Sequence, residues 1–323
     1  MTTAFGRRQL GTILGLVGLG VLLTILTPHF LTISNLLNVT QQTTINAVIA
    51  VGMTFVILSG GIDLSVGSIV ALAGVVLGSA LQAGLPMPAA IALSLVMGAV
   101  CGAVNGLLIT RGGLPPFIAT LGMMSIARGL ALMYTDGRPI SGFDAAFRSL
   151  STSSPLMIPA PVILMIVIYI AAHFVLTRTT FGRYVYAIGG NEEATRLSGV
   201  RVAFHKTMVY VLSGVTSAVA AVTLTARLNS AQPIAGMMYE LDAIAATVIG
   251  GTSLLGGSGT VSGTLVGALI MGVLRNGLNL LGISSFLQQV VIGAVIIAAV
   301  LVDSFLTQRA QRRRARRTTP AAS

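Results

Sequence analysis

Amide side chains occur within long apolar stretches of this sequence, where a polar group is costly. Gln42 and Asn46 are four residues apart and share one face of any helix that contains them. Asn276 and Asn279, three residues apart, form a similar pair. Such amides either hydrogen-bond a polar solute that passes between helices or bind a neighbouring helix, and the second bond is worth about 0.6 kcal/mol in membranes. We favour the bonds between helices and keep all four as candidates for lining a path.

An acidic residue, Asp63, lies in a glycine-rich stretch that occurs twice. Residues 60–68 (GGIDLSVGS) and 250–258 (GGTSLLGGS) are identical at five of nine positions. Duplicated, glycine-interrupted segments in the two halves of a membrane protein point to a transport path, but glycine and serine also converge at turns between packed helices. Asp63 either caps the helix that follows it or contacts a solute, and we favour the cap.

The polar stretch 177–206 contains the signals of a short exposed helix. Asn191 is a good N-cap, and the charges of Glu192 and Glu193 favour a helix N-terminus, while Gly199 can end the helix. The pattern predicts a helix of about two turns on which a partner could dock, and an ordinary charged connector is the alternative. The candidate docking residues are Gly190, Asn191, Glu192, Glu193, Ala194, Arg196 and Gly199.

The chain lacks the usual motifs of catalysis. Its one lysine, Lys206, has no phosphate-binding glycine loop around it, so the chain cannot hydrolyse a nucleotide by that route. Its three histidines are scattered without zinc-binding spacing, and no Gly-x-Ser-x-Gly nucleophile motif occurs. The acidic residues fall mainly outside the apolar stretches, which leaves no machinery for coupling to an ion gradient. We expect no catalytic residue, metal site or cofactor in this chain.

Membrane helices must hold these residues. The 323 residues are 54% hydrophobic and only 8% charged, with a mean hydropathy of +0.92, whereas soluble domains are about 25% charged. Unbroken apolar runs favour helices over a β-barrel, which needs alternating residues. We predict an all-α integral membrane protein with a single transmembrane domain over 1–323 and a broken or re-entrant eighth span. The ten expected spans are 10–27, 43–59, 66–83, 88–109, 117–135, 159–176, 207–226, 241–254, 260–280 and 285–303.

The distribution of lysine and arginine orients this bundle. Ten spans place both termini on one side, which then holds 14 of the 19 basic residues. Because positive charge collects on the cytoplasmic side, we expect both termini, the 177–206 loop and the basic tail 306–323 to be cytoplasmic. The tail is typical of a lipid-headgroup anchor, and a nucleic-acid patch is the less favoured alternative. The amide pairs then lie at the external ends of the second and ninth spans.

Five stretches in the same order resemble the monosaccharide permeases of bacterial ABC importers over nearly the whole chain. They are GGIDLSVG at 60–67, GRY at 182–184 with GGN at 189–191, YELDAIAA at 239–246, GGTS at 250–253 and NGLNLLG at 276–282. Glu192, Glu193 and Ala194, followed by Gly199, also resemble the Glu-Ala-Ala loop of this family, with Glu193 in place of its middle alanine. In the family this loop forms the coupling helix, which lies in a cleft of the ATPase subunit.

The resemblance implies a permease fold and an assembly in which separate subunits form the path, bind ATP and select the sugar. A homodimer of this chain would form the path for a ribose-like monosaccharide across the bacterial inner membrane. A tandem ATPase subunit would bind ATP and Mg²⁺, and a periplasmic binding protein would select the sugar.

Polar residues at the outer mouth of the eighth span could receive that binding protein, although a solvated loop explains them almost as well. They are Arg227, Asn229, Gln232, Glu240 and Asp242. A stand-alone ion-coupled carrier or facilitator is the main alternative function, and a non-transport scaffold is a third.

Overall fold

The computed structural model describes residues 2–155 and 158–318, which form thirteen α-helices and one two-stranded antiparallel sheet. The helices are α1 (Thr2–Leu26), α2 (Ile33–Leu58), α3 (Val66–Gln82), α4 (Met87–Thr110), α5 (Pro116–Thr135), α6 (Ala145–Thr152), α7 (Ala160–Arg178), α8 (Thr180–Gly190), α9 (Glu192–Leu197), α10 (Val202–Leu228), α11 (Tyr239–Ile249), α12 (Val261–Leu280) and α13 (Ser285–Thr318). The strands are β1 (Ile140–Ser141) and β2 (Ser230–Ala231), with Ile140 opposite Ala231. The helical class is confirmed, and the small sheet is an addition that the sequence did not indicate.

Each expected span falls on a helix. Six helices are long and apolar enough to cross a membrane: α2, α4, α5, α7, α10 and α12. Shorter apolar segments lie in α1, α3 and α13. Helix α11 has only 11 residues, which is about 16 Å at the α-helical rise, roughly half the hydrocarbon thickness of a bilayer. The eighth span is therefore a half-length helix, in line with the expectation of a broken segment.

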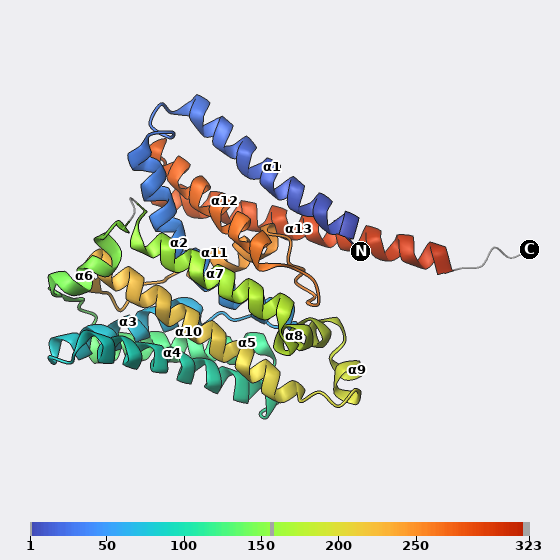
Figure 1. Cartoon of the computed structure of the whole chain (residues 1–323), viewed down its shortest axis with the longest axis horizontal. Helices are drawn as coiled ribbons and strands as arrows, with labels where there is room; N and C mark the ends of the chain where they lie inside the picture. Colours follow the sequence, from blue (N-terminus) through green and yellow to red (C-terminus); the bar gives the residue numbers. More distant parts are fainter. Residues whose placement is uncertain (1, 156–157, 319–323) are drawn as a thin grey trace, which may run out of the picture.

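The bundle has two flanks with α2, α7 and α10 between them. Helices α1, α12 and α13 lie along one flank, and α3, α4 and α5 lie along the other (Figure 1). The start of α1, the end of α13 and the short helix α9 lie at the same end of the bundle, opposite α6 (Figure 1). Helix α2 is almost completely buried in its second half and forms the centre of the main hydrophobic cluster.

Three element boundaries differ from the predicted ones. Helix α2 begins at Ile33, ten residues before the expected span, because the polar run 40–44 continues the helix into the bundle, where Thr43 and Thr44 are buried. Helix α10 begins at Val202, and α13 continues to Thr318 through most of the basic tail. Gln42 and Asn46 consequently lie within α2, so their predicted place at its outer end is wrong.

Glycines on α4 allow α10 to approach closely. Gly98, Gly102 and Gly106 recur every four residues and face the α10 backbone, where a Cβ on Gly102 would lie 2.8 Å from Val211 Cα. A Cβ on Gly106 would lie 2.6 Å from Thr207 Cα. Because such distances are shorter than any normal carbon contact, side chains at these positions would force the two helices apart.

A glycine substitution on this face tests the packing. Gly102→Ala should lower the free energy of unfolding by about 1–3 kcal/mol through overpacking. The matched control is Gly122→Ala on α5, where a Cβ meets no atom within 4 Å and the better helix propensity of alanine should be neutral or stabilising. Thermal unfolding of both variants in detergent measures the difference, and equal midpoints would contradict the predicted packing.

Candidate functional site

A polar cluster lies inside the bundle where α2, α11 and α12 meet. Arg275 on α12 forms an ion pair with Asp242 on α11, with 2.7 Å between Nη2 and Oδ2. The Asn46 amide on α2 donates to the same Oδ2 over 3.1 Å. Gln42 lines the same cavity, whose volume of about 20 Å³ holds about one water molecule and no sugar.

Two oxygens of this cluster carry no hydrogen bond to the described residues. They are Asn46 Oδ1 and Asp242 Oδ1, both buried. An unpaired buried acceptor is costly, so acceptors beside a cavity are suited to a donor that arrives from outside the chain. The hydroxyl groups of a polar solute would supply such donors.

Asp242 does not lie at the outer surface, so its prediction as a residue that receives the binding protein is wrong. Its side chain is 2% exposed because α11 begins inside the bundle. The segment before α11 runs inward until Gly236 packs on Gly67 at the start of α3, where a Cβ on Gly67 would lie 2.6 Å from Glu240 Oε2. Glu240 therefore also lies inward, beside the break between α10 and α11.

Arg128 on α5 holds this irregular segment in place. Its Nη1 donates to the carbonyl oxygens of Pro233 and Ala235, each over 2.7 Å. Non-helical backbone at membrane depth needs such partners because lipid supplies none. The sequence analysis did not select Arg128 or Arg275, although a charged residue within an apolar span is the signal that identifies both.

Asp63 lies in a second buried cluster, between α2 and α3. Its Oδ1 accepts the backbone N–H of Ser65 over 3.0 Å and the Ser65 hydroxyl over 2.6 Å. Its Oδ2 accepts the hydroxyl of Ser213 on α10 over 2.8 Å, and Asn105 on α4 donates to the Ser65 hydroxyl. Asp63 thus bonds to Ser65, which precedes α3, and not to the first turn of α3. Instead of the predicted helix cap, it forms hydrogen bonds that join the loop before α3 to α10.

The second amide pair binds neighbouring helices. Asn276 and Asn35 exchange two hydrogen bonds, of 2.8 and 3.0 Å, between α12 and α2. Asn279 accepts a bond of 2.8 Å from Gln288 on α13. The bonds between helices that we favoured for this pair are present, and neither amide lines the cavity beside Asp242.

The remaining outer residues lie near the end of α10. Asn229 ends the helix with a φ of 50°, and its Oδ1 accepts the backbone N–H of Phe143 over 3.0 Å. Arg227 and Gln232 are half-buried on either side of it. The bond to Phe143 gives Asn229 a structural role in joining the outer loops.

The connector between α7 and α10 contains the expected short helix. Helix α9 has six residues, fewer than the predicted two turns, and its N-cap Asn191 accepts the Ala194 N–H over 2.9 Å. Gly199, with a φ of +82°, follows its C-cap as expected. Only Asn191 separates α9 from α8.

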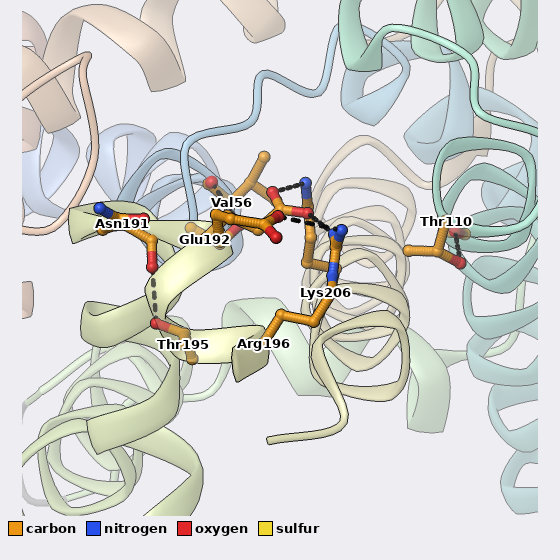
Figure 2. Close-up of polar contacts among 10 residues, drawn as sticks. Val56, Thr110, Asn191, Glu192, Thr195, Arg196 and Lys206 are labelled. Carbon is orange, nitrogen blue, oxygen red and sulfur yellow. Dashed lines mark hydrogen bonds and ion pairs between the residues drawn. The ribbon is translucent and has the colours of Figure 1, made fainter. Parts of the chain in front are cut away.

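One ion pair joins α9 to α10, and others lie within α9 (Figure 2). Glu192 Oε2 lies 2.9 Å from Nζ of Lys206, whose side chain is largely buried at 12% exposure, and Glu192 Oε1 lies 2.8 Å from Arg196 Nη2. Glu193 and Leu197 remain highly exposed on the outside of α9. The helix is therefore anchored on one side and open to a partner on the other, and Leu197 is a contact candidate that the sequence analysis missed.

Residues 35–300 match a protein family described as branched-chain amino acid transport system / permease component. The chain belongs to this permease family. It is 50% identical to the ribose import permease protein RbsC of Escherichia coli K12 over 91% of this chain and 92% of that protein. It is 52% identical to the RbsC of Bacillus subtilis over 92% of both chains, and 40% identical to the D-allose transport system permease protein AlsC of E. coli K12 over 87% and 86%. No solved structure matches the chain.

The expected resemblance to the monosaccharide permeases of importers is confirmed by these relatives. The chain is a multi-pass membrane permease, and as a transport subunit it is not an enzyme.

Removing one partner of the buried ion pair tests the cluster around Asp242. Arg275→Met should lower the free energy of unfolding by about 3–5 kcal/mol, because Asp242 is left buried without its cation. Adding Asp242→Asn should restore most of that loss, since the second change removes the unpaired charge. Thermal unfolding of both variants measures the effect, with Arg138→Met in the outer loop as a control. A double variant no more stable than Arg275→Met would disprove the coupling.

Proposed function

We propose that this permease is the membrane-spanning subunit of a bacterial ABC importer for ribose or a ribose-like monosaccharide. The observation that carries the proposal is the identity of about half of all residues to ribose import permeases from two distant bacteria, over more than nine-tenths of the chain. In this proposal the chain forms the path as a homodimer in the inner membrane. A tandem ATPase subunit binds ATP and Mg²⁺ and supplies the energy, and a periplasmic binding protein delivers the sugar.

Ten membrane crossings with both termini in the cytoplasm complete the proposal. The arrangement in Figure 1 supports it, because the start of α1, the end of α13 and α9 lie at one end of the bundle. With this topology the cytoplasmic side holds 14 of the 19 basic residues, including the arginines of the basic tail, which can bind anionic headgroups.

Helix α9 is the proposed docking element for the ATPase. Its exposed face offers the Glu193 carboxylate beside the apolar Leu197. A cavity of about 1010 Å³ opens beside it, with Arg111, Arg201 and Lys206 among its lining residues. Since Glu192 is bonded to α10, a force applied to α9 is carried into the membrane helices.

The cluster of Gln42, Asn46, Asp242 and Arg275 is the proposed polar lining of the path. Its small cavity corresponds to a closed conformation that a sugar enters only when α11 moves away from α2 or α12. Asp63, Asn276 and Asn279 hold the surrounding helices instead. The binding protein would dock at the opposite end of the bundle from α9, around α6, Arg227 and Gln232.

Reconstitution into liposomes tests the proposed function and its main alternative. With its cognate ATPase and binding protein, the permease should take up radiolabelled ribose only when ATP is present on the cytoplasmic side. Ribose uptake by the permease alone, driven by an ion gradient or by the ribose gradient, would instead identify a carrier or facilitator. Glu193→Lys should release the ATPase during co-purification, and unchanged co-purification with full uptake would contradict docking at α9.

The anchor of α9 gives a separate prediction. Lys206→Met keeps the length of the side chain but removes the ion pair with Glu192, so ATP-driven uptake should fall by about 5-fold or more, the lower limit of typical coupling effects. Arg183→Met, which removes an exposed cation on α8, is the matched control and should leave uptake unchanged. Equal uptake by both variants would show that the Glu192–Lys206 pair does not carry the force.

A further inference from the structure

Two glycine-rich loops from opposite halves of the chain meet at the end of α8. Loop 59–65 follows α2 and loop 250–260 follows α11, and they contain most of the sequence that occurs twice. The Gly257 N–H donates to the carbonyl oxygen of Leu58 over 2.9 Å, which bonds loop 250–260 to the last residue of α2, directly before loop 59–65. A Cβ on Gly256 would lie 3.0 Å from Gly60 N, so the two loops are also close to each other.

Gly189 of α8 lies directly against this bond. A Cβ on Gly189 would overlap the Leu58 carbonyl oxygen and lie 2.5 Å from Gly257 N. From the other side, a Cβ on Gly256 would lie 2.9 Å from Gly189 O. The contact is therefore made by bare backbone on both sides. At the next residue, Gly190, a Cβ would meet no atom within 4 Å.

Tyr186 holds α8 to the same place one turn earlier. Its hydroxyl donates to the Gly259 carbonyl oxygen over 2.8 Å. Burial raises the pKa of Tyr186 above its usual value, so the phenol stays protonated and remains a donor. Val185 and Ile188 are buried on the same helix, so α8 is packed into the bundle along its last two turns.

Each loop leads directly to one of the buried polar clusters. Loop 59–65 carries Asp63, which is bonded to Ser213 on α10. Loop 250–260 continues from α11, which carries Asp242 of the proposed path. Only Gly190 and Asn191 separate Gly189 from the start of α9.

We propose that Gly189 is the positioning residue through which a displacement of α9 reaches both loops at once, an inference that rests on the proposed function of α9 as the ATPase docking element. Because α8 is one continuous helix joined to α9 by a single residue, α9 cannot move far without moving Gly189. The backbone contact of Gly189 then shifts Leu58 and Gly257 together. Loop 59–65, which contains Asp63, and loop 250–260, which follows α11, move with them. A side chain at position 189 separates the loops and breaks this link while leaving the exposed face of α9 unchanged.

The test compares two glycines in the assembled transporter. Permease, ATPase and binding protein are reconstituted in liposomes, and the number of ribose molecules taken up per ATP hydrolysed is measured. Gly189→Ala should retain the ATPase on co-purification but lower this ratio about tenfold, within the usual range of coupling free energies. Gly122→Ala on α5, where a Cβ meets no atom within 4 Å, is the control and should keep the wild-type ratio. A wild-type ratio in Gly189→Ala, or an equal loss in both variants, overturns the inference.

A second variant covers the case in which Gly189→Ala does not fold. Tyr186→Phe removes the bond to Gly259 without adding an atom, so it should fold and still lower the ratio several-fold. An unchanged ratio in Tyr186→Phe together with an unfolded Gly189→Ala would overturn the inference. If the wild-type complex takes up no ribose at all, the proposed function itself is refuted, and the inference that rests on it falls as well.

Discussion

Backbone that leaves the helical path inside a membrane must find hydrogen-bond partners within the protein, and this requirement shapes the whole bundle. The chain leaves the helical path at three places that matter for the site: 59–65, 232–238 and 250–260. At each place a side chain or another loop supplies the missing partners. Asp63 binds the Ser65 N–H in the first, Arg128 binds two carbonyl oxygens in the second, and Gly257 binds Leu58 O in the third.

These breaks are also where the charged residues of the interior gather. A continuous helix satisfies its own backbone and would leave a buried carboxylate without donors, whereas the end of a helix or a loop offers free N–H groups and room for a cation. Asp242 lies one turn into the half-length helix α11 and is neutralised by Arg275. The irregular segments thus serve two purposes, because they provide points at which the bundle can change shape and positions at which polar groups can face a solute.

Much of this organisation could be predicted from the sequence. Composition and apolar runs placed a helix at every expected span. The N-cap Asn191 predicted the start of α9. These features could be predicted because they depend only on residues that are close together in the sequence.

The features that were not predicted depend on distant contacts. Asp242 was placed at the outer mouth of the eighth span because its position at the start of a short apolar stretch does not reveal that Arg275, 33 residues later, lies beside it. The start of α2 was placed too late because hydropathy counts Gln42 and Thr43 as polar, although their helix is enclosed by α11 and α12. The role of Arg128 was missed because its two carbonyl partners lie more than 100 positions away along the chain.

Lys206 has one more consequence, which follows from its being the only lysine in the chain. An amine-reactive label has a single side-chain target here, and that target is shielded by its carboxylate partner on α9. The labelling rate of this one amine would therefore report how often α9 separates from α10 in the resting protein, without a label site having to be introduced.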